Sequence, residues 1–350
     1  MKKTFLIPFL LLVISLTACK QTNSIPSSEK QLNQNQFTLV FASCNDQNRE
    51  QPLWKPIINT QPDLFIWGGD NVYSDTDDMQ KMASDYNKVW ANKEYKKLAK
   101  NTPIIGTWDD HDYGKNDGGK EWHKKEEAQQ VFLDFLKLEK DNPRRKREGV
   151  YHAQTFASKA GSIKVILLDT RYFRDSLKRN PNPKNDYERY IPWNEGEGGS
   201  ILGSEQWHWF ENELKDDSAD FTVIVSSIQF LSNQHGFEKW ANHPSEVEKM
   251  YQAIQHAKAK NILILSGDRH HAEVSVNQVT GLDDPLVDFT SSGLTHTWPG
   301  TPMDTNPYRV GEGTKELNFG VLYFDFENEK VTYQIRGENN ILYQEFIQQY

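Results

Sequence analysis

The sequence contains little cysteine, with only Cys19 and Cys44 among 350 residues. A fold held together by several disulfides is therefore excluded. The chain also has no excess of positive charge, because 40 Lys and Arg residues face 49 Asp and Glu residues, for a formal net charge of -9. A surface that binds nucleic-acid duplexes needs concentrated Lys and Arg, so we expect no duplex binding. Charged residues at 25% and aromatic residues at 12% are instead typical of a folded globular protein.

The N-terminal apolar run, residues 5–16, is too short to span a membrane as a stable helix. Lys2 and Lys3 precede this run, and a Leu-Thr-Ala-Cys sequence ending at Cys19 follows it, which is the order of a secretory signal. This ending resembles the bacterial lipobox, in which the cysteine is lipidated and becomes the first mature residue. An ordinary signal peptide with a coincidental cysteine is the alternative.

We therefore expect residues 1–19 to be a lipoprotein signal, with Cys19 as the lipidation site. Residues 20–36 are rich in Ser, Asn, Gln and Lys without an apolar period, which predicts a solvated, flexible tether before a folded domain over residues 37–350. The membrane would then be a partner through the N-terminal lipid. The protein would be a membrane-anchored bacterial lipoprotein on the periplasmic or cell-surface side.

Lipidation of Cys19 would leave Cys44 as a single thiol in an exported protein. Compartments outside the cytoplasm oxidise thiols, so an unpaired cysteine there suggests a specific use. A buried, inert thiol is the alternative. Its position after a hydrophobic run favours a metal ligand.

Four short hydrophobic runs each end in side chains that can bind metal ions. Each reads as a buried strand, and ligand sites in α/β sheets lie outside the carboxyl ends of the strands. The runs cover residues 40–42, 64–67, 104–108 and 262–265, and they are followed by Cys44, by Asp70 and Tyr73, by residues 109–112, and by residues 268–271. A capping aspartate, a surface tyrosine or a solvated acidic turn would explain one such strand end alone. Four of them predict a metal site.

The remaining pattern predicts one α/β domain of strand-helix units followed by hairpins, in which two mixed sheets pack together with helices outside. We expect strands over residues 37–42, 64–67, 104–108, 150–156, 163–169, 221–226, 261–265, 272–276, 286–289, 318–326, 330–336 and 341–347. We expect helices over residues 52–58, 78–99, 121–138, 204–214 with Ser204 as N-cap, and 244–257.

The strand ends also carry a family resemblance. The motifs are Gly69-Asp70-Asn71-Val72-Tyr73, Trp108-Asp109-Asp110-His111, residues 168–174, residues 202–207 and Ser266-Gly267-Asp268-Arg269-His270. In this order, over residues 37–290, they resemble the PhoD-like alkaline phosphatases, a branch of the calcineurin-like metallophosphoesterases. The resemblance implies a four-layer αββα sandwich that hydrolyses phosphate mono- or diesters with a metal-bound hydroxide.

The resemblance also implies metal ligands. An iron(III) ion would be bound by Cys44, Asp70, Tyr73 and His270, and phenolate and thiolate ligands suit such an ion. Asp70 would bridge to a second metal, which would be calcium or another divalent ion such as magnesium, manganese or zinc. The further ligands of this second metal would be Asp110 and Asp268. Four additional side chains stay open as ligands: Asn116, Asp117, Gln229 and His235.

Three side chains are expected to act on the substrate or its surroundings. Asp110 belongs to the catalytic centre as a metal ligand, and His111 follows it directly. His111 can protonate the leaving group without binding metal, with Asp109 or Asp112 orienting its ring. Arg171 could hold a phosphate by bidentate contacts, as Arg174 could, or form a salt bridge that ties the long loop after residue 174 to the domain.

Other functions remain as competing hypotheses. The chain could be a lipoprotein that binds a ligand without catalysis, with the acidic strand ends merely solvated. It could also be an oxidase that uses the same iron, or a phosphodiesterase that acts on phospholipid or on cell-envelope polymers. Only a phosphohydrolase explains the strand-end residues together.

Overall fold

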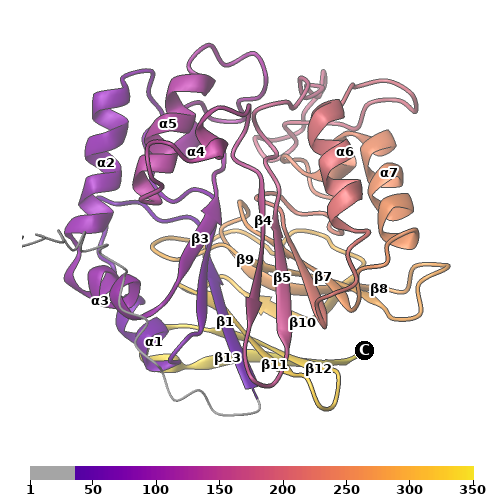
Figure 1. Ribbon diagram of the computed structural model, residues 1–350. Helices are drawn as coiled ribbons and strands as arrows, with labels where there is room; N and C mark the ends of the chain where they lie inside the picture. Colours follow the sequence, from indigo (N-terminus) through magenta and orange to yellow (C-terminus); the bar gives the residue numbers. More distant parts are fainter. Residues whose placement is uncertain (1–35) are drawn as a thin grey trace, which may run out of the picture. The chain divides into compact units, whose positions relative to one another are not determined.

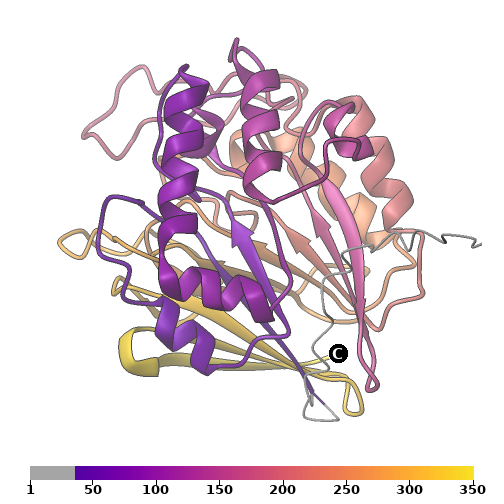
Figure 2. The same cartoon turned by 60° about the vertical axis from the view of Figure 1, so that its left-hand side comes forward.

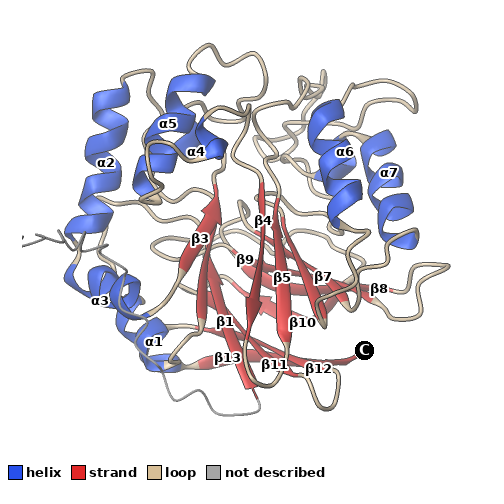
Figure 3. Cartoon of the chain, viewed as in Figure 1, coloured by secondary structure: helices blue, strands red, loops and turns tan. Residues whose placement is uncertain are grey.

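The computed structural model of this chain describes residues 36–350. The predicted signal, the lipidation site Cys19 and all but the last residue of the tether lie outside the described residues. Two mixed β-sheets pack against each other between helices (Figure 1), and Figure 3 separates the red sheets from the blue helices. This architecture confirms the predicted four-layer αββα sandwich.

The first sheet has six strands in the order β13-β12-β11-β1-β2-β3. Its β1–β2 and β2–β3 pairs are parallel, and its other pairs are antiparallel. The strands are β1 (Gln36–Ala42), β2 (Leu64–Gly68), β3 (Ile104–Thr107), β11 (Phe319–Asp325), β12 (Lys330–Arg336) and β13 (Leu342–Gln349).

The second sheet has seven strands in the order β10-β8-β9-β7-β6-β5-β4. Its pairs from β5 through β6 and β7 to β9 are parallel, and the others are antiparallel. The strands are β4 (His152–Ala157), β5 (Ser162–Leu167), β6 (Phe221–Val225), β7 (Ile262–Ser266), β8 (Ala272–Asn277), β9 (Leu286–Ser291) and β10 (Arg309–Thr314).

The helices cover the outer faces of the sheets, as the turned view in Figure 2 also shows. They are α1 (Trp54–Asn59), α2 (Met79–Ala91), α3 (Lys93–Asn101), α4 (Asp110–Tyr113), α5 (Lys125–Phe135), α6 (Gly203–Glu213) and α7 (Pro244–Gln255), with short 3-10 turns η1 (Pro143–Arg145), η2 (Trp240–Asn242) and η3 (Glu338–Asn340). Among these described elements, no helix has the length and apolar character needed to cross a membrane.

The hydrophobic strands are buried on both faces because each face has its own core. In β2, Phe65 and Trp67 pack with the helices on one side, whereas Leu64 and Ile66 pack between the sheets. Side chains alternate across a strand, so a continuous apolar run supplies both layers at once. The carboxyl ends of these parallel strands then point to one edge of the sandwich.

Several predicted element boundaries were wrong. The single helix expected over residues 78–99 is two helices, because Asn92 is extended and its side chain accepts hydrogen bonds from the backbone N–H groups of Glu94 and Tyr95. The helix expected from residue 121 begins at Lys125. The N-cap of α6 is Leu202 rather than Ser204, and no side chain caps it.

Candidate metal centre

The predicted strand-end side chains converge at one edge of the sandwich. Cys44 follows β1, Asp70 follows β2, Asp110 begins α4 just after β3, and Asp268 follows β7. The loops after β1 and β2 are joined by backbone hydrogen bonds from Cys44 N to Gly69 O at 3.4 Å and from Asn45 N to Asp70 O at 2.8 Å. Parallel strands deliver these side chains to the same place, as the sequence predicts.

One side of the centre contains sulfur, phenol and imidazole. The Cys44 thiol donates to Asp70 Oδ2 at 3.4 Å, and the Tyr73 hydroxyl donates to the same oxygen at 3.3 Å. The Tyr73 hydroxyl also lies 3.5 Å from His270 Nε2. The four side chains that the resemblance assigns to iron are thus adjacent.

The other side of the centre is a group of carboxylates. One oxygen from each of four aspartates lies within 4.8 Å of the others, namely Asp70, Asp109, Asp110 and Asp268. One ligand atom from each of Asp70, Asp110 and His111 also lies within 4.8 Å of the other two. Asp70 belongs to both sides, which is the position that a bridging ligand requires. Asp109 was predicted to orient His111, and its place in this group was not predicted.

The backbone at the centre adopts an uncommon conformation. Cys44, Asp70, Asp268 and His270 all have positive φ, at 59°, 50°, 68° and 53°. Residues other than glycine rarely adopt such angles, which cost about 1–3 kcal/mol each and gather at functional sites. Four such residues lie close together at this centre. This indicates that the fold tolerates backbone strain here in order to direct their side chains to one point.

The electrostatics of the centre call for a cation. Burial and then neighbouring carboxylates raise the pKa of Asp268 well above its usual range. Burial also raises the pKa of Asp70, which nearby His111 only partly offsets. Burial followed by the Asp70 carboxylate raises the pKa values of the Cys44 thiol and the Tyr73 phenol. Protons suppress these charges, and a bound metal ion would favour the deprotonated forms instead.

Buried polar atoms without hydrogen-bond partners indicate whether metal ions fit this centre. Among the described residues, Asp109 Oδ2, Asp110 Oδ1 and His270 Nδ1 are buried without a hydrogen-bond partner. Buried polar atoms rarely lack partners, and carboxylate oxygens without donors can coordinate a hard cation. Thiolate, phenolate and imidazole donors beside them suit iron. The residues present therefore fit metal ions on both sides of Asp70.

His111 is held at the rim of this centre. Its Nδ1 lies 2.8 Å from the carboxylate of Asp75, and its ring stacks on Tyr73 with centroids 4.1 Å apart. The predicted orienting acids were Asp109 and Asp112, but these point elsewhere, because Asp112 accepts from the Asp109 backbone N–H at 2.7 Å. Although burial lowers the pKa of His111, the carboxylates of Asp110, Asp70 and Asp75 raise it to about 11.

Arg171 and Arg174 form buried ion pairs. Arg171 is fully buried and its guanidinium lies 2.6 Å from Asp109 Oδ1 and 2.5 Å from Glu238 Oε2. Arg174 Nε lies 2.8 Å from the other oxygen of Glu238. Both arginines therefore form salt bridges, which was the alternative prediction, and their guanidinium groups are not free to hold a phosphate. Arg171 thus acts on the centre through Asp109.

The four side chains left open as ligands have separate positions. Asn116 is exposed, whereas the backbone N–H of Asp117 donates to Asp110 Oδ2 at 2.7 Å. The Gln229 amide donates to Glu273 and Thr290, at 2.8 and 2.9 Å, and so is engaged away from the aspartate group.

His235 is buried and accepts from the backbone N–H of Phe237 at 3.3 Å. Among the described residues, its Nε2 has no hydrogen-bond partner. Neither Asp117 nor His235 belongs to the groups of closely spaced His, Cys, Asp and Glu side chains that the described residues form.

Sequence reasoning assigned no role to some supporting residues. Ser292 Oγ lies 3.0 Å from Cys44 Sγ and accepts from the His270 backbone N–H at 3.0 Å. It follows the hydrophobic run of β9, so the same strand-end pattern could have identified it. Asp75 and Glu238 come from loops without any periodic signal.

Comparisons with known proteins agree with this geometry. The PhoD-like phosphatase family profile matches residues 39–335. Alkaline phosphatase D of Bacillus subtilis (strain 168) is 24% identical over 276 residues, which cover 67% of this chain and 46% of that protein. The chain thus spans about half the length of the curated relative it matches.

Solved structures share the fold. A PhoD structure matches with a TM-score of 0.68 at 17% identity, covering 90% of this chain and 68% of that one. A dimetal phosphatase from Danio rerio matches with a TM-score of 0.52 at 13% identity, covering 90% and 99%. GAP50, described as the anchor in the inner membrane complex of Plasmodium, matches at 0.58 and 12% identity, covering 90% and 89%. The fold alone therefore does not separate a phosphatase from an anchor.

Proposed function

The chain belongs to the PhoD-like phosphatase family, and we propose that it is a metal-dependent phosphohydrolase for phosphate mono- or diesters. One observation carries this proposal. Cys44 and Tyr73 both contact one oxygen of Asp70, and Asp70 also belongs to the carboxylate group with Asp110 and Asp268. A site with soft and aromatic donors on one side and oxygens on the other suits two different metal ions.

We assign the ligands as follows. Iron(III) is held by Cys44, Asp70, Tyr73 and His270, and a divalent ion, calcium or alternatively magnesium, manganese or zinc, is held on the carboxylate side. Its side-chain ligands are Asp70, Asp110 and Asp268, with Asn116 as the further candidate and Asp109 close enough to join. When bound, such ions polarise a phosphoryl group and lower the pKa of water.

The protein's own residues supply the remaining steps. His111 holds a proton at neutral pH and lies beside Asp110, so it can donate that proton to the departing alkoxide. Asp75 orients its ring through Nδ1. Arg171 holds Asp109 in place from within the protein, which makes it a positioning residue.

The location of the enzyme is part of the proposal. The order of charged, apolar and small residues before Cys19 supports a lipoprotein signal over residues 1–19 and a tether over residues 20–36. We infer a catalytic domain over residues 37–350 that is anchored by lipid on the extracytoplasmic side. Its substrates would then be esters outside the cytoplasm, including those of phospholipid or cell-envelope polymers.

A second candidate function is a ligand-binding lipoprotein without catalysis. The likeness to GAP50, described as an anchor, is the observation that favours it. The positive φ angles and buried carboxylates at one point favour catalysis, because a solvated acidic rim would need neither. An oxidase that uses the same iron has no separate support in the structure.

A chromogenic ester assay separates these functions. The full chain, loaded with calcium and iron, is incubated with nitrophenyl phosphate and with bis-nitrophenyl phosphate. We expect metal-dependent release of nitrophenolate that is abolished in Asp70→Asn and retained in Gln154→Ala, an exposed control on β4. If folded, metal-loaded protein hydrolyses neither ester, the result would favour a ligand-binding lipoprotein without catalysis.

A further inference from the structure

A cavity of about 470 Å³ lies between the edge strands of the two sheets. β3 ends the order of the first sheet and β4 ends that of the second. Ile104 and Ile105 open β3, whereas Asp110 follows its other end, so the cavity shares no residue with the metal centre. Its size is within the usual range for small-molecule pockets.

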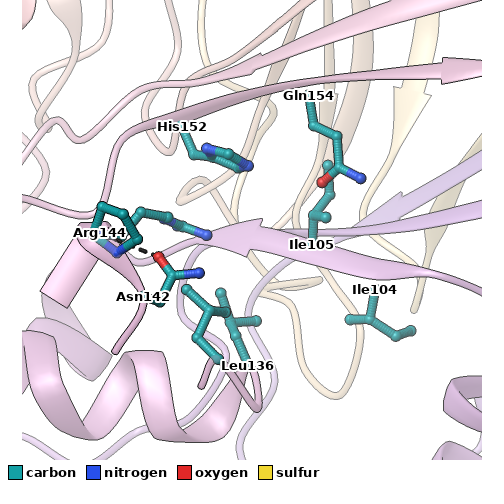
Figure 4. Close-up of a pocket in the computed structure, with 9 residues that line it drawn as sticks. Ile104, Ile105, Leu136, Asn142, Arg144, His152 and Gln154 are labelled. Carbon is teal, nitrogen blue, oxygen red and sulfur yellow. Dashed lines mark hydrogen bonds between the residues drawn. The ribbon is translucent and has the colours of Figure 1, made fainter. Parts of the chain in front are cut away.

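The cavity has an apolar side and a polar side (Figure 4). The apolar side consists of Ile104 and Ile105 with two leucines that follow α5, Leu136 and Leu138. All four are only partly buried, so they leave apolar surface open in the cavity. Covering apolar surface of this kind with the hydrocarbon of a ligand removes it from water and therefore favours binding.

The polar side is cationic. Arg144, Asn142 and His152 line it together with Gln154, which is exposed on β4. The Arg144 side chain donates one hydrogen bond to the described residues, from Nη2 to Val150 O at 2.8 Å. Its Nε is buried and, among the described residues, has no hydrogen-bond partner.

Arg144 also has no anionic partner within residues 36–350. Burial lowers its pKa to about 10, and the charged neighbour that contributes is a second cation, Arg147. By contrast, Arg145 of the same turn lies 2.7 Å from the Asp134 carboxylate, and Arg171 is paired twice. A buried guanidinium without an anion is costly, and a bound carboxylate or phosphate would offset that cost.

We propose that this cavity binds an anionic amphiphile, with its carboxylate or phosphate head on Arg144 and its hydrocarbon on Ile104, Ile105 and the two leucines. Neither an anion alone nor a hydrocarbon alone uses both sides of the cavity. The head group belongs either to a free fatty acid or to a phospholipid-like phosphate ester, since a guanidinium binds both by paired hydrogen bonds.

Calorimetric titration of the full, metal-loaded chain tests this. Octanoate represents a fatty acid, and octylphosphonate represents a phosphate head that is not hydrolysed. We expect both to bind with one molecule per cavity, about tenfold or more tightly than acetate, inorganic phosphate or octanol, because each of these lacks one half of the recognition. The tighter of the two amphiphiles identifies the class of head group.

Three variants locate the binding. Arg144→Gln removes the cation, and Gln154→Glu adds a negative charge from an exposed strand position where folding is not at risk. Both should weaken octanoate binding by about tenfold or more, the scale of a lost charge-assisted hydrogen bond. Lys146→Gln removes the same charge from an exposed position in the same turn and should bind normally.

Three results would overturn the proposal. The first is octanol binding as tightly as octanoate. The second is a loss of binding in Lys146→Gln as large as in Gln154→Glu. The third is competition between octanoate and nitrophenyl phosphate for the metal centre. Each of these results would show either that octanoate binds outside this cavity or that its anionic head group does not contribute to binding.

Discussion

Replacing His111 with alanine tests how the leaving group receives its proton. The imidazole lies beside Asp110 and is oriented by Asp75 at 2.8 Å from Nδ1. Its pKa, raised to about 11 mainly by Asp110 and Asp70 against the effect of burial, keeps the proton in place at neutral pH. Loss of a general acid of this kind costs roughly a hundredfold or more in turnover.

The assay compares two leaving groups. Nitrophenolate departs without a proton, whereas an alkyl alkoxide needs one, so His111→Ala should lose much more activity on an alkyl phosphate than on a nitrophenyl phosphate. Metal content measured on the same protein should stay unchanged. Equal losses on both esters, or loss of metal, would refute the role and make His111 a structural residue or a ligand in the group with Asp70 and Asp110.

Asp75→Asn is the matched variant for the orientation of the ring. Removing this carboxylate lowers the pKa of His111, so the alkaline limb of the kcat profile should move to lower pH, with a smaller loss of activity than in His111→Ala. A pH profile unchanged from wild type would show that Asp75 does not act on the catalytic proton.

Three further predictions concern the buried charges and the anchor. Arg171→Met should lower the free energy of unfolding in urea by roughly 3–5 kcal/mol, because Asp109 loses its buried cation and Glu238 keeps only Arg174, whereas a loss under about 1 kcal/mol would show that these ion pairs add little to stability. Burial raises the pKa of Asp288 from its usual 3.8 to about 6, so its folded state binds a proton more tightly and its contribution to stability is lost as pH rises through that window. The difference in unfolding free energy between wild type and Asp288→Asn should therefore change by roughly 2 kcal/mol from pH 4 to pH 6, and a constant difference would contradict the raised pKa. Cys19→Ser should move the protein from the membrane fraction to the soluble one, or leave it held by an uncleaved signal, with full specific activity, and an inactive but folded variant would place Cys19 in the site instead.

The sheets could be predicted because their strands are strongly patterned. Apolar runs such as β2 are bounded by glycine, and one rule places polar residues after the carboxyl ends of parallel strands. That rule alone predicts that Cys44, Asp70 and Asp268 lie together. It depends on backbone direction alone, which is why it succeeds without side-chain detail.

Other features had no such signal. β10 contains Gly311 and Gly313 and has no buried residue, so it lacks the alternation of a strand. α4 has four residues, which is too short for a helical period. The contacts of His111 with Asp75 and of Arg171 with Glu238 join segments distant in sequence, and only the packed fold determines which charges meet.

Metal analysis of protein purified without added metal tests the central claim most directly, together with its visible absorption spectrum. We expect bound iron and a divalent ion, and a visible charge-transfer band from thiolate or phenolate bound to iron(III) at Cys44 and Tyr73. Tyr73→Phe should shift or bleach this band while the fold is retained. An active, colourless protein that contains no iron would contradict the ligand assignment around Asp70.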